Sequence, residues 1–118
     1  MSRKPTALIN ELYDELLAGN HAVVERLVAA DYYSHTESRE VDRASLLESC
    51  IEWMAPFHSL RREVILEVNE GDRGVVFHRV RAIERQTGRE VRMRSADAYR
   101  VRDGLLCEHW GVLMTEGT

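Results

Sequence analysis

The feature that most limits the fold is a run of alternating residues in the second half of the chain. Residues 89–102, REVRMRSADAYRVR, place Val91, Met93, Tyr99 and Val101 on one side and mostly arginines on the other. A period of two is typical of a β-strand with one buried face. The segments around this run, residues 62–74, 74–88 and 105–114, are also rich in β-forming residues and are separated by glycine-containing turns.

The first half of the chain has helical periodicity instead. Residues 6–18 repeat leucine every four positions, and residues 21–30 predict a short second helix. A third helix is expected to begin at an Asp42 cap and to end before Pro56. Its predicted buried stripe consists of Leu46, Leu47, Cys50, Ile51 and Met54. Between the second and third helices, residues 31–36, DYYSHT, predict a strand that ends in a loop.

Helices followed by an antiparallel meander predict an α+β fold, with the helices packed on one face of a curved sheet. The length of 118 residues suits a single domain spanning residues 1–118.

Composition and charge exclude several classes of partner. The net charge of −4 argues against nucleic acid, and the basic run at residues 90–102 is interpreted as one face of a strand. No apolar run approaches the roughly 20 residues of a membrane span, and the first residues do not form a signal peptide. Cys50 and Cys107 fit no metal or redox spacing, so we expect free thiols and a cytoplasmic protein.

The alternation of the strands turns several polar residues inward. His78, Asp97 and His109 fall on the faces that carry the apolar residues, and His35, with Tyr33 beside it, is expected to join them. An apolar cavity with a few converging polar groups is the usual form of a small-molecule site. The alternative is that each is a structural core residue, because a single inward histidine is more often a hydrogen-bonded part of the core than a functional group.

Three motifs carry a family resemblance that covers nearly the whole chain. They are the helix–Ala-Gly-Asn–helix opening at residues 18–20, the Asp-Tyr-x-x-His ending of the first strand, and the closing DAYRVRDGLLCEHW. Together they resemble the SnoaL-like polyketide cyclases of the nuclear-transport-factor-2-like superfamily.

The resemblance implies a cone: a bent antiparallel sheet wrapped around three N-terminal helices, with a ligand cavity inside. Catalytic members of the superfamily use acid–base chemistry without metal or cofactor. In the cyclases, Glu-His-Trp is typically followed by an aspartate, which the resemblance implies is the general base for the aldol step. In this chain that position is Gly111. His35 is similar in position to the carboxylate base of the ketosteroid isomerases, and Asp97 to their protonated acid. The isomerases' pocket tyrosine falls near Leu12, and its role is not transferred to Tyr13.

These considerations predict a protein that binds a small hydrophobic molecule, and an acid–base enzyme if it is catalytic. His35 is the first candidate for the base and His109 the second, with a protonated Asp97 or His78 as the donor to a developing enolate oxygen. The predicted pocket residues are Tyr33, Trp53, Met54, Met93, Tyr99, Gly111 and Leu113.

Other possibilities remain open. A binding protein without chemistry is favoured by Gly111, and an accessory domain would have a cone filled by its own side chains. No cofactor is expected, nor a metal, because the five histidines include no HxH or HxxxH pair.

A homodimer is also expected. Phe77 and Trp110 fall on the outward faces of their strands, and exposed aromatic residues usually mark an interface.

Overall fold

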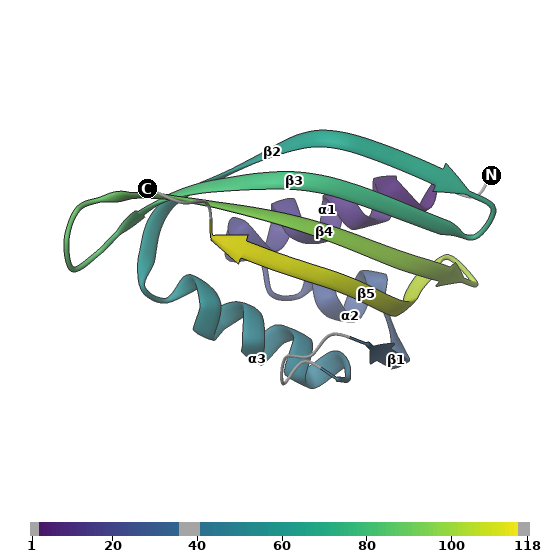
Figure 1. The fold of residues 1–118 in the computed structure, drawn as a ribbon. Helices are drawn as coiled ribbons and strands as arrows, with labels where there is room; N and C mark the ends of the chain where they lie inside the picture. Colours follow the sequence, from purple (N-terminus) through teal and green to yellow (C-terminus); the bar gives the residue numbers. More distant parts are fainter. Residues whose placement is uncertain (1–2, 36–40, 116–118) are drawn as a thin grey trace.

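The computed structural model describes residues 3–35 and 41–115, and it places three helices on one side of a five-stranded sheet (Figure 1). This confirms the predicted α+β class. The elements in chain order are α1 (Pro5–Leu17), α2 (Val23–Leu27), β1 (Val28–Ser34), α3 (Arg43–Met54), β2 (Phe57–Glu70), β3 (Arg73–Glu84), β4 (Glu90–Arg102) and β5 (Leu105–Thr115).

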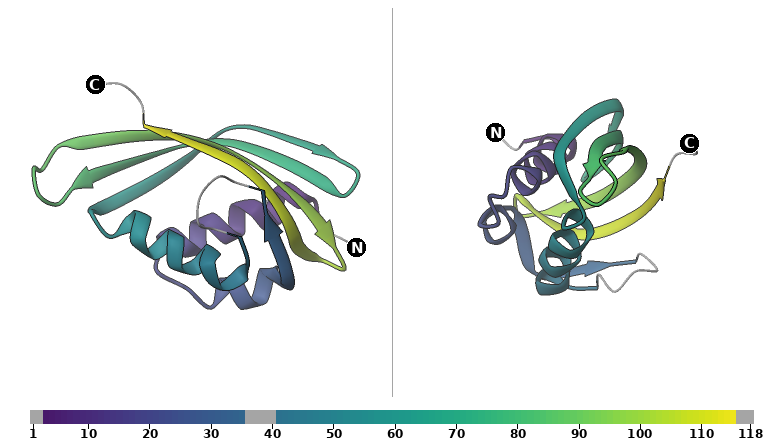
Figure 2. Two further views of the ribbon diagram at one scale, coloured as in Figure 1. Left: turned by 60° about the horizontal axis from the view of Figure 1, so that its bottom comes forward. Right: turned by 90° about the vertical axis from the view of Figure 1, so that its left-hand side faces the viewer.

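The strand order in the sheet is β1-β5-β4-β3-β2. Strands β2 to β5 form the expected antiparallel meander, whereas β1 pairs with β5 in parallel. Asp103 and Gly104 join β4 to β5 with φ values of 54° and 77°, the two positive angles that a type I′ hairpin turn requires. Pairing shifts in β2 and between β4 and β5 add local twist. The sheet therefore arches over the helices (Figure 2).

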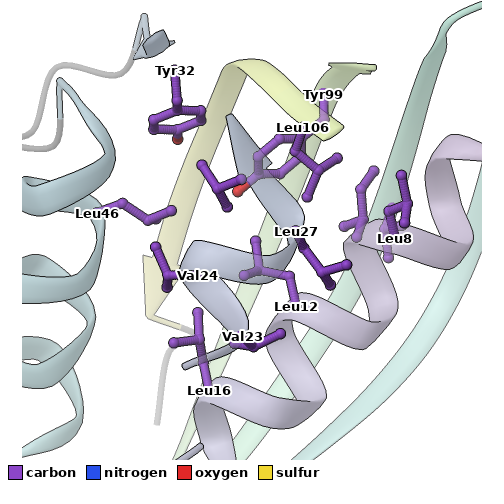
Figure 3. Packing of buried hydrophobic residues seen from close by; sticks show 13 residues of the cluster. Leu8, Leu12, Leu16, Val23, Val24, Leu27, Tyr32, Leu46, Tyr99 and Leu106 are labelled. Atoms are coloured by element: carbon purple, nitrogen blue, oxygen red, sulfur yellow. The ribbon is translucent and has the colours of Figure 1, made fainter. Parts of the chain in front are cut away.

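The main core lies between α1, α2 and the inner face of the sheet. Leu8, Ile9, Leu12 and Leu16 are buried along α1, with Tyr13 and Leu17 half-buried beside them. The four buried side chains meet residues of α2, β1 and the last two strands, and Figure 3 shows Leu12 of α1 near Leu27 and Leu106. Each large aliphatic side chain buried in this way contributes about 1.5–3 kcal/mol.

Two helices differ from the sequence prediction. Helix α2 ends at Leu27 because the chain turns into β1 at Val28, three residues earlier than expected. Helix α3 begins at the Asp42 cap as predicted, but among its residues only Leu46 is buried, and Ile51 is 44% exposed. The predicted buried stripe is therefore wrong as a description of burial, because part of this face borders an open pocket and is not packed against the sheet.

The parity of β1 is opposite to the expected one. Tyr32 and Ser34 are buried, whereas Tyr33 and His35 are exposed. The register of the parallel pair, in which Ser34 lies beside His109, fixes this orientation. Thr36, the last residue of the predicted strand and loop, lies outside the described residues.

The face of the sheet turned away from the helices, called the outer face below, carries exposed apolar side chains. Leu66 and Phe77 are directly opposite each other on β2 and β3, and the same row continues through Ala96 to Val112. Phe77 is 40% exposed and Val112 is 58% exposed. Within the described ranges, no helix has the length and hydrophobicity needed to cross a membrane.

Candidate functional site

Three inward polar residues form a diagonal line across β3, β4 and β5. In the strand register, His78 lies opposite Ser95, Asp97 opposite Gly111, and His109 opposite Tyr99. Each of the three is therefore two residues along from the next. All three are at least 95% buried, and the carboxylate of Asp97 bonds to both imidazole rings. The sequence placed these residues on the inner face, and the structure brings them into direct contact.

Asp97 is held as a carboxylate at the centre of this line. Its Oδ1 lies 2.7 Å from Nε2 of His109, and its Oδ2 lies 2.6 Å from Nε2 of His78 and 2.5 Å from Oγ of Ser95. Burial alone would raise the pKa of Asp97, but the hydrogen bonds that its carboxylate accepts from His109 and His78 hold it well below its usual range. An ionised Asp97 has no proton to give, so it is not the hydrogen-bond donor considered from the sequence.

Arg62 fixes the tautomer of His78. Nε of Arg62 donates to Nδ1 of His78 over 2.7 Å. Because a guanidinium can only donate, Nδ1 must accept, and the ring proton of His78 therefore sits on Nε2 and is donated to Asp97. The guanidinium also donates to Asn10 and Asp14 of α1, and the Arg62 side chain is only 4% exposed.

His109 is held on both of its ring nitrogens. Nε2 donates to Asp97, and Nδ1 lies 3.0 Å from the buried hydroxyl of Ser34. The ring also stacks on Tyr99, with 4.3 Å between ring centroids, and on Tyr32. These contacts set both the position and the plane of the ring.

This line of polar residues borders a pocket of about 970 Å³ between the sheet, α1 and α3. Its polar wall includes Arg62, His78, Ser95, Asp97 and His109. Its apolar wall includes Leu16, Leu17, Leu46, Trp53, Val80 and Leu113. An apolar chamber with polar groups gathered at one place suits a ligand that is apolar over most of its surface and polar at one end.

Tyr13 of α1 also lines the pocket. Its hydroxyl lies 2.7 Å from the hydroxyl of Tyr99, which is fully buried behind it. The guanidinium of Arg62 lies 5.7 Å from the centre of the Tyr13 ring. Tyr13 is thus a polar group of the pocket that comes from a helix and not from the sheet.

His35 stands apart from the inward line. Its Nε2 lies 2.6 Å from Oε2 of Glu108, and its ring stacks on Trp110 at 4.9 Å. The hydrogen bond from His35, together with one from Arg100, lowers the pKa of Glu108. His35 contributes to the pocket wall, but it is exposed and lies at the margin, and no hydrogen bond links it to Asp97 in the described part of the chain.

The other predicted pocket residues divide into two groups. Trp53, Gly111 and Leu113 line the pocket. Tyr33, Met54, Met93 and Tyr99 do not. Tyr33 is exposed beside His35, and Met93 packs in a small core with Val80 and Ala82. Met54 lies 3.6 Å from the Cys50 thiol, and Tyr99 sits behind Tyr13.

Sequence reasoning missed Arg62, Ser34 and Tyr13. Arg62 follows a pairing irregularity between His58 and Arg61, which hides its inward orientation from any alternation pattern. The inward orientation of Ser34 follows from the observed parity of β1, which is opposite to the predicted one. Tyr13 lies beside the leucine stripe of α1, where a half-buried tyrosine is ordinary core.

Within residues 3–35 and 41–115, no group of three His, Cys, Asp or Glu side chains is placed to hold a metal ion. Cys50 and Cys107 are both free thiols.

Known structures share this architecture. The most similar ones include AclR, a proposed hydroxylase from Streptomyces galilaeus, which is 23% identical with a TM-score of 0.82 over 93% of this chain and 88% of its own. IdmH, a proposed polyketide cyclase from Streptomyces antibioticus, is 26% identical with a TM-score of 0.82 over 94% of this chain and 92% of its own. A proposed polyketide cyclase from Acidithiobacillus ferrooxidans is 21% identical with a TM-score of 0.81, over 96% and 89%.

Comparison with curated proteins gives no match. The model of the SnoaL-like domain matches residues 9–109, which include most of α1, all of α2 and α3, and the line from His78 to His109. The chain therefore belongs to the SnoaL-like family, and its cone-shaped α+β fold is that of the nuclear-transport-factor-2-like superfamily.

Proposed function

We propose that this SnoaL-like protein binds a small, largely apolar carbonyl compound and performs cofactor-free acid–base chemistry on it, as a cyclase or an isomerase. The observation that carries the proposal is the hydrogen-bonded line of His78, Asp97 and His109 in the wall of an otherwise mainly apolar pocket. The similarity to IdmH supports the same class of reaction.

In this proposal His109 is the base. Its Nε2 proton is committed to Asp97, so a proton taken from the carbon next to the substrate's carbonyl is received at Nδ1. Because the Ser34 hydroxyl lies 3.0 Å from Nδ1, it relays this proton: it passes its own proton to Nδ1, takes the proton that leaves the substrate carbon, and then accepts from the new N–H. The ionised Asp97 stabilises the positive ring that results, and return of the proton at another atom completes an isomerisation.

Tyr13 is the proposed donor to the developing enolate oxygen. Asp97 is ionised, and the single ring proton of His78 is already donated to Asp97. Tyr13 lines the pocket, and the Tyr99 hydroxyl can donate to the Tyr13 hydroxyl, an arrangement in which Tyr13 donates to the ligand.

Exchange of carbon-bound hydrogen tests this proposal without knowledge of the product. Aromatic ketones such as 1-tetralone and 2-tetralone would be incubated with the protein in D₂O, and loss of the α-hydrogen signal would be followed by NMR. We expect the protein to accelerate exchange of at least one ketone of such a panel. We expect His109→Gln and Asp97→Asn to lower that rate by about 10²–10⁴-fold.

His35→Gln is the matched comparison, because His35 is the other histidine considered as a base. We expect it to keep the rate within about tenfold, a difference of about 1.4 kcal/mol in barrier. Loss of exchange in His35→Gln with full exchange in His109→Gln would assign the base to His35. Circular dichroism of each variant separates a lost base from a lost fold.

A second candidate function is ligand binding without chemistry. Both ring nitrogens of His78 and both of His109 already have partners within the protein, an arrangement that also suits a rigid binding wall. Thermal stabilisation by ketones that show no accelerated exchange would favour this function. A volume of about 970 Å³ leaves room for a ligand and speaks against a filled cone with only an accessory role.

We also propose that the protein forms a homodimer through the outer face around Phe77 and Trp110. Support comes from the exposed apolar row that runs from Leu66 through Phe77 to Val112. A cytoplasmic location stays a prediction, with which the two free thiols are compatible.

A further inference from the structure

Gly111 is unusual because its backbone conformation does not require glycine. It lies inside β5, and it is not among the residues with positive φ. Glycine inside a strand weakens it, and it often marks a place where another group approaches closely. The reason for this glycine must therefore lie in its surroundings.

The group that approaches is the hydrogen bond between Asp97 and His109. A Cβ atom at position 111 would lie 2.6 Å from Oδ1 of Asp97 and 2.7 Å from Nε2 of His109. These are the two atoms that the 2.7 Å hydrogen bond joins. The bond therefore passes through the space that any other residue at position 111 would fill.

The strand register explains why the bond takes this path. Asp97 lies directly opposite Gly111, and His109 is two residues before Gly111 on β5. Diagonal neighbours of this kind have Cα atoms about 7–8 Å apart. To meet, their side chains must lean toward each other across the position between them, and on β5 that position is 111.

We infer that Gly111 is a positioning residue, whose missing side chain lets the Asp97 carboxylate reach His109. A methyl group at position 111 would push the carboxylate away from His109. Asp97 would keep its bonds to His78 and Ser95, because both are made by the other carboxylate oxygen. Gly111→Ala should thus break the bond from Asp97 to His109 and leave the bond to His78 intact. The catalytic consequence of this change rests on the proposed function.

Gly74 offers a matched control. It is also in a strand without positive φ, and a Cβ there would lie 2.8 Å from Cβ of Pro5 and 3.0 Å from the backbone nitrogen of Thr6. Gly74→Ala thus introduces comparable crowding on the same face of the sheet, against the start of α1. It touches neither Asp97 nor the two histidines.

The test is NMR of the histidine ring nitrogens and their protons, with signals assigned through His78→Gln and His109→Gln. We expect the unmodified protein to show two protected Nε2–H protons, each bonded to a carboxylate. In Gly111→Ala we expect the signal of His109 to shift or disappear and that of His78 to remain. In Gly74→Ala we expect both to remain. An unchanged His109 signal in Gly111→Ala, or an equal disturbance in Gly74→Ala, would overturn the inference.

If Gly111→Ala fails to fold, a comparison of stabilities decides instead. Removing the carboxylate with Asp97→Ser takes away the main clash, so we expect Gly111→Ala/Asp97→Ser to be more stable than Gly111→Ala alone. A double variant no more stable than the single one would show that the two positions are not coupled, and would refute the inference.

The inference and the proposed function fail separately. A one-sided NMR change in a protein that exchanges no ketone hydrogen leaves the role of Gly111 intact and removes the catalytic proposal. Full exchange activity in a Gly111→Ala protein whose Asp97–His109 bond is broken also removes the catalytic proposal, since the pair would then be dispensable.

Discussion

At the scale of single residues, the charge state of Asp97 organises the site. A buried carboxylate is costly unless it is hydrogen-bonded, and here two imidazole rings and a serine supply the bonds. The sequence could place Asp97 on the inner face through the alternation of β4. It could not reveal the ionisation state, because that depends on contacts with residues 12 and 19 positions away.

This environment predicts a specific loss of stability in acid. Asp97 has a lower pKa in the folded chain than the value near 3.9 of an unfolded one, so the unfolded chain takes up the proton first. The contribution of Asp97 is fully present above that unfolded value and is lost as pH falls toward its folded pKa. We expect urea midpoints to decline below about pH 5 in the unmodified protein and to decline less in Asp97→Asn.

Asp31→Asn is the control for that series. Asp31 is exposed and pairs with Arg102 at the surface, where such a pair contributes about 0–1 kcal/mol. Parallel pH curves for Asp97→Asn and the unmodified protein would contradict the proposed ionisation of Asp97.

At the scale of elements, strands with a clear alternation were predictable and mixed segments were not. Strand β4 has one apolar and one basic face, so its orientation followed directly from the sequence. Strand β1 is short and has aromatic residues on both faces, and its parity is decided by its pairing with β5. Helix α3 has an apolar stripe that partly borders a pocket, a difference that periodicity alone does not record.

The start of α3 depends on a reciprocal cap. The Asp42 side chain accepts from the backbone N–H of Ser45, and the Ser45 hydroxyl accepts from the backbone N–H of Asp42. We expect Asp42→Ala to lower the free energy of unfolding by about 0.5–2 kcal/mol. Lys4 holds the same position on α1 without a side-chain bond, so Lys4→Ala should change it by less than about 0.5 kcal/mol. Equal effects of the two substitutions in urea unfolding would argue against the cap.

The turn between β4 and β5 requires a residue that tolerates a positive φ. Gly104 has a φ of 77°, in a region that costs other residues about 1–2 kcal/mol. We expect Gly104→Ala to lower the unfolding free energy by about that amount in urea denaturation. Asp103→Asn should leave it nearly unchanged, because asparagine tolerates positive φ. A neutral Gly104→Ala would show that the turn can adopt another form.

At the scale of the whole molecule, the layer of helices covers only the inner face of the sheet (Figure 2). The outer face keeps a row of exposed apolar side chains on neighbouring strands. Fold class was predictable because it follows from the order of helical and alternating segments. A homodimer could be expected from the sequence because Phe77 and Trp110 fall on outward faces. The sequence does not identify the partner that would cover those faces.

The proposed homodimer gives a prediction at this scale. In sedimentation velocity at micromolar concentration we expect a dimer, and we expect Phe77→Arg or Val112→Lys to give a monomer that remains folded. Ile51→Lys is the control, because Ile51 is similarly exposed but lies on α3, away from the outer face. A monomeric unmodified protein, or dissociation by Ile51→Lys alone, would count against this interface.

The parallel pairing of β1 with β5 has a consequence for how the protein is made. Residues 28–34 emerge early during translation, but their partner strand, residues 105–115, emerges some 75 residues later. Until then the buried faces of α1 and α2 lack Leu106 and Tyr99, which complete their core. Nascent chains should therefore remain exposed to chaperones and proteases until synthesis reaches β5, and shorter chains halted on the ribosome should stay sensitive to proteolysis.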